Sequence, residues 1–356
     1  MRTPQVMIDE VLLDANIAAM AAVMGKKAIG MRPHVKTHKI PQIARRQLAA
    51  GASGITVATI GEAEVFVDAG VDDVFVAYPL WLTGESAARL VALTGRARIA
   101  IGVDSVRGAV EAGALLGDSA PSIEALIELD SGHHRSGVRP GEAVDVARAV
   151  VDAGLRLRGV FTFPGHSYGP DAARSAAHDE ACVLGAAAAM LADAGLPVAV
   201  RSGGSSPSAL FADPDGLTEA RPGVYVFGDA QQWELGRIGP GQIALTVLGT
   251  VISRHDGEHR RVVLDSGSKV LGADRPAWTS GFGRLLDHPD ARITALSEHH
   301  ATVVFPPEQP LPELGTRLRV VPNHVCQVLN LVDEVTVVRE GEPVDRWPVA
   351  ARGCNS

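Results

Sequence analysis

The sequence has few cysteines and few aromatic residues, and it lacks long apolar runs. Phe, Trp and Tyr together make up 4% of the 356 residues, and the three cysteines, Cys182, Cys326 and Cys354, are widely spaced. An odd number of distant cysteines indicates no disulfide framework. No apolar run approaches the roughly 20 residues of a membrane-spanning helix, and the first four residues do not open a signal peptide. We therefore expect a soluble cytoplasmic protein with no membrane segment.

The chain also lacks long basic tracts, and its formal net charge is −8. Proteins that bind nucleic acids concentrate Lys and Arg to neutralise phosphates, so we expect no nucleic-acid partner. Residues 32–39 are a local exception: they read Arg-Pro-His-Val-Lys-Thr-His-Lys, and five of these eight are His, Lys or Arg. A solvated basic loop would have this composition. Alternatively, neighbouring cations favour the neutral, nucleophilic form of one of its lysines.

Short apolar runs alternate with longer helical patterns over the first part of the chain, which is typical of βαβ units and a parallel sheet. The predicted strands are residues 28–31, 55–58, 74–77, 99–103, 125–129, 157–163, 198–201 and 224–227. The predicted helices between them include residues 61–69, 86–93, 106–116, 141–153 and 172–194. Eight strands favour a closed (β/α)₈ TIM barrel over an open sheet, although no full helix separates the last two.

The pattern changes after residue 227. Gly239-Pro240-Gly241 interrupts the chain, and apolar and polar residues then alternate with period two, as in antiparallel strands. The strands predicted there are residues 244–251, 261–264, 293–296, 301–305, 317–321 and 334–339. We therefore predict an α/β protein with two domains, a barrel domain at residues 1–238 and an antiparallel β domain at residues 239–356.

Polar and glycine-rich segments follow the predicted barrel strands, where the active sites of such barrels lie. Lys36 follows the first strand. The segments 130–135, 165–168, 202–206 and 221–223 follow or surround the fifth to the eighth strand. Because these strand ends meet at one face of a barrel, we expect their side chains to line one site.

One of these segments consists of small residues only, namely Ser202, Gly203, Gly204, Ser205 and Ser206. The backbone N–H groups of such a turn can close on an anion, glycine lets the backbone approach closely, and serine hydroxyls add donors. A plain turn has the same composition. The predicted position after the seventh strand favours phosphate binding, since barrel enzymes often bind phosphate there.

A second candidate site lies at His324 and Cys326, within Pro-Asn-His-Val-Cys. In a strand, residues two apart project to the same side, so the imidazole and the thiolate would converge in a way that suits Zn²⁺. A chance His-x-Cys pair is the alternative, because cysteine is also a common core residue.

Residues 32–39 resemble the lysine motif of the D-threonine aldolase and D-serine dehydratase family, whose members are pyridoxal 5′-phosphate (PLP) enzymes of the alanine-racemase-like fold type. This resemblance implies that Lys36 forms the Schiff base with PLP. Residues 130–138, Asp-Ser-Gly-His-His-Arg-Ser-Gly-Val, also resemble the family, which implies that Arg135 contacts the phenolic oxygen of PLP. Residues 202–206 resemble its phosphate loop, and Gly223 and Tyr225 match the next phosphate contact.

Four further residues each have two interpretations under this resemblance. His166 and Tyr168 lie where relatives place residues around the cofactor ring, or they are structural. Arg221 matches the alanine-racemase arginine that faces the pyridine nitrogen and makes the ring a poorer electron sink; otherwise it is a surface charge. His300 keeps the histidine of the family segment Ser-Glu-Glu-His-Gly, here Ser-Glu-His-His-Ala, and is a candidate base or a turn residue.

His324 and Cys326 match the metal-binding His-x-Cys or His-x-Asp of the family. The cysteine version is similar to zinc-dependent D-serine dehydratases, so Zn²⁺ is the expected metal, with Mn²⁺ and Mg²⁺ as alternatives. The resemblance implies a homodimeric lyase for small β-hydroxy D-amino acids, and it favours conversion of D-serine to pyruvate and ammonia with Lys36 as the base at Cα. Retro-aldol cleavage to glycine and an aldehyde, with His300 as base, is the first alternative. A non-catalytic PLP-binding protein is the second.

Overall fold

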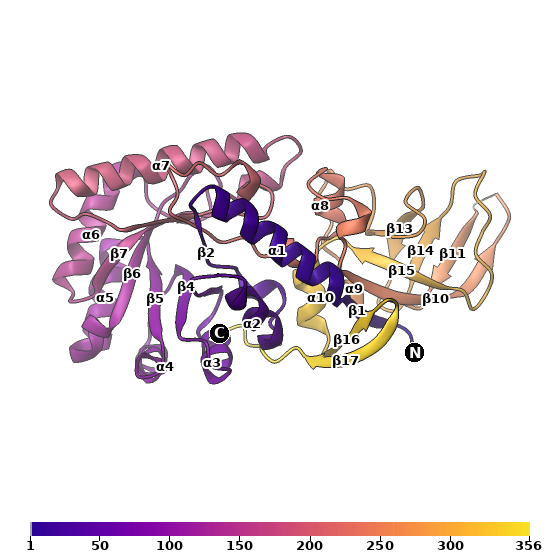
Figure 1. The fold of residues 1–356 in the computed structure, drawn as a ribbon, viewed down its shortest axis with the longest axis horizontal. Coiled ribbons are helices and arrows are strands. Elements are labelled where there is room, and N and C mark those ends of the chain that lie inside the picture. The colour runs from indigo at the N-terminus through magenta and orange to yellow at the C-terminus, as the bar shows by residue number, and fades with distance from the viewer. Residues whose placement is uncertain (1, 259) are drawn as a thin grey trace. The chain divides into compact units, whose positions relative to one another are not determined.

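The computed structural model describes residues 2–258 and 260–356 (Figure 1). The contacts within the chain divide it into two compact units. The barrel unit comprises residues 19–36, 43–223 and 353–356, and the β unit comprises the described residues of 1–18, 37–42 and 224–352. Each unit is therefore built from segments that are distant in the sequence.

Eight parallel strands form the sheet of the barrel unit. Along the chain they are β2 (Gly30–Met31), β3 (Ile55–Val57), β4 (Asp73–Pro79), β5 (Arg98–Val103), β6 (Ile123–Glu128), β7 (Arg156–Phe161), β8 (Val200–Gly203) and β9 (Glu219–Ala220). Their hydrogen-bonded order is β2-β9-β8-β7-β6-β5-β4-β3. Backbone hydrogen bonds from Ser53 to Met31 and from Thr56 to Pro33, both 2.8 Å, join the two ends of this order. The sheet therefore closes, and the predicted (β/α)₈ barrel is confirmed.

Helices connect the barrel strands, and three of them begin at a side-chain cap. Thr59, Thr83 and Ser105 each accept a hydrogen bond from the backbone N–H three residues later, which satisfies one free amide of the first helical turn. The helices are α2 (Pro41–Ala49), α3 (Ile60–Asp68), α4 (Gly84–Thr94), α5 (Val106–Leu116), α6 (Ala143–Asp152) and α7 (Ala173–Asp193). Except for α2, which the sequence analysis does not predict, they agree closely with the predicted helices.

Short 3₁₀ helices complete the connections of both units. They are η1 (Val35–Thr37), η2 (Gly117–Ser122), η3 (Pro140–Glu142), η4 (Gly165–Tyr168), η5 (Ala209–Phe211), η6 (Val224–Val226) and η7 (Pro240–Gln242). Among the described residues, none of the helices combines the length and the apolar character that crossing a lipid bilayer requires.

The eighth barrel strand lies earlier in the chain than predicted. The prediction of a strand at residues 224–227 is wrong, because Val224–Val226 forms η6 and the eighth strand is β9. The residues of 224–227 are apolar and buried, and such a run imitates a strand in the sequence. The real strand has only two residues, and one of them is Glu219, whose buried carboxylate accepts a hydrogen bond from Arg32 Nε at 2.7 Å. A charged residue in so short a strand conceals it from a search for apolar runs.

Nine strands form the sheet of the β unit. They are β1 (Gln5–Asp9), β10 (Leu245–His255), β11 (Arg261–Leu264), β12 (Gly283–Leu285), β13 (Arg292–Leu296), β14 (Ala301–Val304), β15 (Arg317–Pro322), β16 (Glu334–Arg339) and β17 (Glu342–Pro348). Among the described strands of this sheet, neighbours pair antiparallel except β1 and β16, which are parallel. The predicted β domain is therefore present, but its sheet is mixed because β1 enters from the start of the chain.

The β unit contains the helices α8 (Ala230–Glu234), α9 (Ser268–Leu271) and α10 (Val325–Leu331), and it also contains the first part of α1 (Glu10–Lys26), whose residues from 19 onward belong to the barrel unit. α1 begins at Asp9, whose Oδ1 accepts hydrogen bonds from the backbone N–H groups of Val11 and Leu12 at 3.0 and 3.1 Å. Such a cap compensates amides that have no partner within the helix.

Both ends of the chain pack against segments that are distant in the sequence. In the β unit, β1 buries Val6 and Ile8 and pairs with β10 and β16. In the barrel unit, Thr59 Oγ1 donates a hydrogen bond of 2.7 Å to the carbonyl of Cys354. A division at residue 238 places β1 in the barrel domain and residues 353–356 in the β domain, whereas the contacts assign each to the other unit.

Candidate active site

The lysine motif lies where β2 ends. Arg32, the first residue of the motif, is buried and donates hydrogen bonds to Asp73 and Glu219 at 2.6 and 2.7 Å, so it holds barrel strands together. Lys36 lies four residues further on, in η1, and its side chain is half-buried. The conformation of Pro33 favours an extended chain before it and ends the strand. The motif therefore combines a structural arginine with an accessible lysine.

Lys36 lines a pocket of about 540 Å³ within the barrel unit, a size typical of small-molecule sites. The lining residues are His34, Lys36, Ala58, Thr59, Ala77, Tyr78, Pro79, Asp104, Arg135 and Ser136. They come from the ends of β4 and the loops after β2, β3, β5 and β6, which is the face where (β/α)₈ enzymes hold their active sites. Lys36 and Arg135, both predicted site residues, therefore share one pocket.

An aromatic ring that the sequence analysis does not single out lies beside two residues of this pocket. The ring centroid of Phe163 lies 5.7 Å from Lys36 Nζ and 5.1 Å from the Arg135 guanidinium carbon. His133 packs edge-on against the same ring with centroids 5.6 Å apart, and Tyr168 lies tilted to it at 6.4 Å. A ring face attracts cations, so Phe163 keeps both cations at the end of β7. Its position at the end of a predicted apolar strand is the signal in the sequence.

The loops after β6 and β7 interlock through two glycines. A Cβ on Gly165 would lie 2.5 Å from the ring of His133, and a Cβ on Gly132 would lie 3.3 Å from the ring of His166. His166 Nε2 lies 3.3 Å from Asp179 Oδ2 on α7, and His166 does not line the Lys36 pocket. Burial, followed by the nearby charges of Arg135 and His166, lowers the pKa of His133. These histidines therefore pack the two loops together, and a role of His166 at the cofactor ring stays a prediction.

The small-residue segment is buried and already hydrogen-bonded. Gly204 N–H donates to Glu180 Oε2 at 2.7 Å, and Ser205 N–H donates to Ser208 Oγ at 3.0 Å. Ser202 turns into the barrel, where its hydroxyl donates to Glu219 Oε1 at 2.7 Å. None of residues 202–206 lines the Lys36 pocket. Of the predicted phosphate donors, Ser202 is therefore committed to the barrel interior, and the turn is held in shape from behind.

Arg221 points into the barrel rather than to the surface, with 5% of its area exposed. Its guanidinium donates hydrogen bonds of 2.6 Å to Ser202 Oγ and to the Thr162 carbonyl. It also lies over the rings of Phe75 and Phe161, 5.7 and 5.4 Å from their centroids. Burial lowers the pKa of Arg221 to about 10, although nearby glutamates act in the opposite direction. A buried cation therefore lies beneath the mouth of the barrel.

The segment after Arg221 connects to the lysine motif. The carbonyl of Pro222 accepts a hydrogen bond of 3.0 Å from the backbone N–H of His34. Gly223, which follows, is half-buried. Tyr225, in η6 of the β unit, is buried. Their contact with a phosphate stays a prediction.

The metal motif has a different local structure from the one predicted. The strand geometry assumed for His324 and Cys326 is wrong, because β15 ends at Pro322 and α10 begins at Val325. Val325, Val328 and Leu329 are buried along one face of this helix, and that spacing favours a helix over a strand. His324 is the N-cap residue, but its side chain makes no capping hydrogen bond and is hydrogen-bonded to the side chain of Cys326 instead.

A carboxylate orients the imidazole of His324. Asp274 Oδ2 lies 2.7 Å from His324 Nδ1, and Asp274 Oδ1 accepts a hydrogen bond of 2.6 Å from Gln327 Nε2. Burial lowers the pKa of His324, but the negative charge of Cys326 and its hydrogen bond, with Asp229 and Asp274, outweigh burial and raise it to about 10. Histidines that bind metals are commonly held in this way through the other ring nitrogen.

The donor types of this pair fit Zn²⁺, since imidazole and thiolate are both common zinc ligands. Among the described residues, however, no three His, Cys, Asp or Glu side chains gather into a group that could hold a metal ion. Two protein ligands would leave the remaining positions to water or substrate. Cys326 Sγ also donates to Thr37 Oγ1 at 3.4 Å, and Thr37 is the next residue after Lys36 in the chain.

His300 is exposed in the turn between β13 and β14. Its backbone carbonyl accepts a hydrogen bond of 2.8 Å from Ser297 N–H. This geometry suits a turn residue, and a role of His300 as a base stays a prediction.

Comparisons with known proteins agree with this architecture. Residues 8–231 match the family described as "Alanine racemase, N-terminal domain", and residues 244–338 match the "Putative serine dehydratase domain". D-threo-3-hydroxyaspartate dehydratase of Delftia sp. (strain HT23) is 36% identical, over 91% of this chain and 90% of that protein. D-threonine aldolase of Arthrobacter sp. is 32% identical, over 99% of this chain and 93% of that protein.

The solved structures agree as well. The crystal structure of D-threonine aldolase from Filomicrobium marinum superposes with a TM-score of 0.90 at 32% identity, covering 99% of this chain and 96% of that one. These matches span both units and extend over nearly the whole chain. The chain therefore belongs to the D-threonine aldolase and D-serine dehydratase family of alanine-racemase-like, fold type III PLP enzymes.

Proposed function

We propose that the protein is a PLP- and metal-dependent lyase for β-hydroxy D-amino acids, and that its reaction is dehydration of D-serine to pyruvate and ammonia. The observation that carries this choice is the hydrogen-bonded pair of His324 and Cys326 with Asp274 behind the imidazole. A thiolate prefers a soft cation such as Zn²⁺, whereas Mn²⁺ and Mg²⁺ prefer oxygen ligands.

PLP, when bound, supplies an electron sink for the electron pair that Cα releases. The amine of Lys36 would hold the cofactor aldehyde, and Arg135, in the same pocket, would hold its phenolic oxygen. The phosphate would lie at the turn of residues 202–206, where the Gly204 and Ser205 amides already donate to Glu180 and Ser208. Its proposed donors are Ser206, Gly223 and Tyr225, and Ser202 donates to Glu219 inside the barrel. His166 and Tyr168 would flank the site through their loop.

Lys36 has a second role, in moving a proton. In the proposed reaction, the Lys36 side chain would be the group that accepts the proton from Cα of the substrate. Arg221 is buried and remains a cation at neutral pH. It would therefore disfavour a second positive charge nearby, such as a protonated pyridine nitrogen of PLP. The charge of Arg221 would in this way limit the negative charge that can accumulate at Cα, so loss of the proton and loss of the hydroxyl would be closely coupled.

Zn²⁺ would be held by His324 and Cys326 and would supply a Lewis acid for the β-hydroxyl group of the substrate. Asp274 fixes Nδ1 of His324, which leaves Nε2 for the metal. Thr37, which contacts Cys326, follows Lys36 directly in the chain.

Retro-aldol cleavage is the second candidate, favoured by the likeness to D-threonine aldolases. It requires a base for the β-hydroxyl instead of proton removal from Cα, and His300 is the proposed residue. The exposure of His300 and its turn geometry support the dehydratase instead.

A product assay distinguishes these functions. We expect purified protein to release 2-oxobutyrate from D-threonine and pyruvate from D-serine, with loss of activity after chelation and recovery on adding Zn²⁺. Glycine plus acetaldehyde from D-threonine would establish the aldolase instead. D-threo-3-hydroxyaspartate, named for a relative, tests whether an acidic side chain is preferred. Bound cofactor without any product would favour a non-catalytic PLP-binding protein.

We also propose a homodimer in the cytoplasm, on the basis of the family likeness. Light scattering coupled to size-exclusion chromatography measures the molar mass in solution, and a mass of one chain would contradict the dimer.

A further inference from the structure

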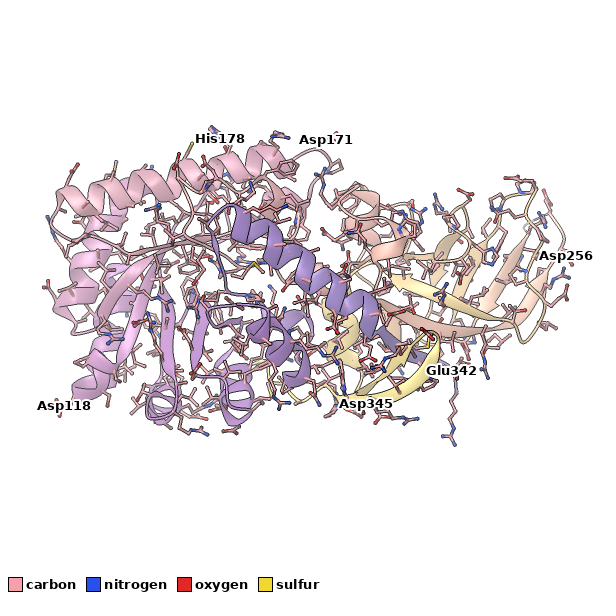
Figure 2. All side chains as sticks on the ribbon, viewed as in Figure 1. Asp118, Asp171, His178, Asp256, Glu342 and Asp345 are labelled. Carbon is pink, nitrogen blue, oxygen red and sulfur yellow. The ribbon has the colours of Figure 1, made fainter. Side chains whose placement is uncertain are left out.

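The turn after β8 is held from behind by one buried carboxyl group. Glu180 lies on α7 and is fully buried. Its Oε2 accepts the Gly204 N–H at 2.7 Å, and its Oε1 accepts the Ser208 hydroxyl at 3.3 Å. His178, two residues earlier on the same helix, projects to solvent (Figure 2). Because residues two apart lie on nearly opposite faces of a helix, α7 directs Glu180 specifically to the turn.

Ser208 extends this contact along the turn. Its hydroxyl accepts hydrogen bonds of 3.0 Å from both the backbone N–H and the hydroxyl of Ser205. The Ser205 hydroxyl also lies 2.8 Å from the hydroxyl of Ser167, in the loop after β7. All three serines are buried. A hydrogen-bonded chain therefore runs from Glu180 through Ser208 and Ser205 to Ser167, and it joins α7 to two loops of the barrel mouth.

The backbone of the turn is shaped around this carboxyl group. Gly204 has φ of +78°, a conformation that side chains disfavour, and a Cβ on Gly203 would lie 2.7 Å from Glu180 Oε2. A buried carboxyl group is costly unless its oxygens are hydrogen-bonded. Both oxygens of Glu180 have partners here, and the charge of Arg221 acts on the same group.

We infer that Glu180 is a positioning residue for the phosphate end of PLP. Glu180 accepts a hydrogen bond from the Gly204 N–H, and Ser208, which donates to Glu180, accepts one from the Ser205 N–H. The turn is therefore ordered before an anion binds. A turn that is already ordered binds its anion without the entropy cost of ordering several residues. This inference rests on the proposed PLP function, because it assigns the anion of that cofactor to the turn.

PLP and pyridoxal provide the test, since they share the ring and the aldehyde and differ only in the phosphate. The dissociation constant of each is measured on cofactor-depleted protein from the absorbance of the lysine-bound form. We expect Glu180→Leu to weaken PLP about tenfold or more, as for loss of a hydrogen bond to a charged group, and to leave pyridoxal unchanged within about twofold. Glu180→Gln keeps an oxygen for the Gly204 N–H and should retain most of the affinity for PLP.

Asp193→Leu, at an exposed position of the same helix, is the matched control and should change neither constant. Equal weakening of PLP and pyridoxal by Glu180→Leu would overturn the inference, as would unchanged PLP affinity. If Glu180→Leu does not fold, Ser208→Ala removes the acceptor for Ser205 with a smaller change, and it must show the same selective loss of PLP. Failure of the proposed function itself looks different, because neither compound would then bind to wild-type protein in a manner that depends on Lys36.

Discussion

The barrel unit and the β unit assemble their polar residues in different ways. In the barrel unit, the pocket around Lys36 takes one to three residues from each of several βα segments. In the β unit, the group around His324 combines neighbours in the chain with Thr37 and Asp274, which are 287 and 50 residues away. In a parallel barrel, residues that follow successive strands meet at one face. In the mixed sheet, the residues that meet lie far apart in the sequence, with no regular spacing between them.

The largest effect is expected from removing the amine of Lys36, which lines the pocket of the barrel unit. Lys36→Met should abolish the absorbance of lysine-bound cofactor and lower kcat by about 10²–10⁴-fold, because both the carrier and the proton acceptor are lost. Lys39→Met is the control: Lys39 Nζ donates to Asn330 Oδ1 at 3.0 Å in the β unit, so this change should reduce stability but keep the cofactor absorbance. The assignment fails if the two variants exchange these behaviours.

The second prediction tests the β unit through Asp274. Asp274→Asn keeps the shape of the side chain but removes the charge beside His324 Nδ1, and metal affinity should fall about 10–100-fold. Competition with a chromophoric chelator measures that affinity. Asp287→Asn is the matched control, since Asp287 pairs with Arg319 on the exposed side of the same unit. Unchanged metal affinity in Asp274→Asn would mean that the imidazole needs no carboxylate to orient it.

This contrast explains what could be predicted from the sequence. Lys36 and Arg135 were expected at one site because both follow barrel strands, and they line the same pocket. The turn at residues 202–206 also follows a barrel strand, and its role as a phosphate site stays a prediction. Phe163 was missed because an aromatic residue at a strand end looks like core. Glu180 was missed because a glutamate within a long helix looks like a solvated side chain, and only the packing of α7 shows that it is buried.

The errors have equally local causes. The eighth strand is two residues long and charged, and the buried run at residues 224–227 imitated it. The His-x-Cys pair converges although it begins a helix, because Cys326 lies in the first turn and His324 caps it. Asp274 leaves no signal in the sequence, since its partner His324 is 50 residues further on and belongs to a different element.

The interlocked loops of the barrel mouth allow a third prediction. Gly165→Ala places a Cβ 2.5 Å from the ring of His133, which is itself packed against Phe163, so either the exposed His133 side chain or one of the two loops must move. We expect a loss of about 1–3 kcal/mol in the free energy of unfolding, as for other overpacked sites, measured by urea denaturation. Gly141→Ala, with no atom within 4 Å of the added Cβ, should change stability by less than about 0.5 kcal/mol. Equal effects of the two variants would show that the loops are not packed together.

The last prediction is a pH dependence that comes from one buried carboxyl group of the barrel unit, Glu180. Burial raises the pKa of Glu180 from an ordinary 4.5 to about 7, against the hydrogen bond from Gly204 and the charge of Arg221. The folded protein therefore holds a proton that the unfolded chain releases, and the stability gained from it is lost as the pH rises from about 4.5 to 7. The slope is at most about 1.4 kcal/mol per pH unit.

Glu180→Gln removes this titration while leaving an oxygen for the Gly204 N–H, so its unfolding free energy should be flatter than that of wild type across this range. Denaturant unfolding at a series of pH values measures both curves. The difference between the two curves isolates Glu180, because all other titrating groups are common to both proteins. Parallel curves would mean that the carboxyl group ionises as readily when folded as when unfolded. Helix α7 would then not enclose Glu180 tightly enough for it to hold the turn.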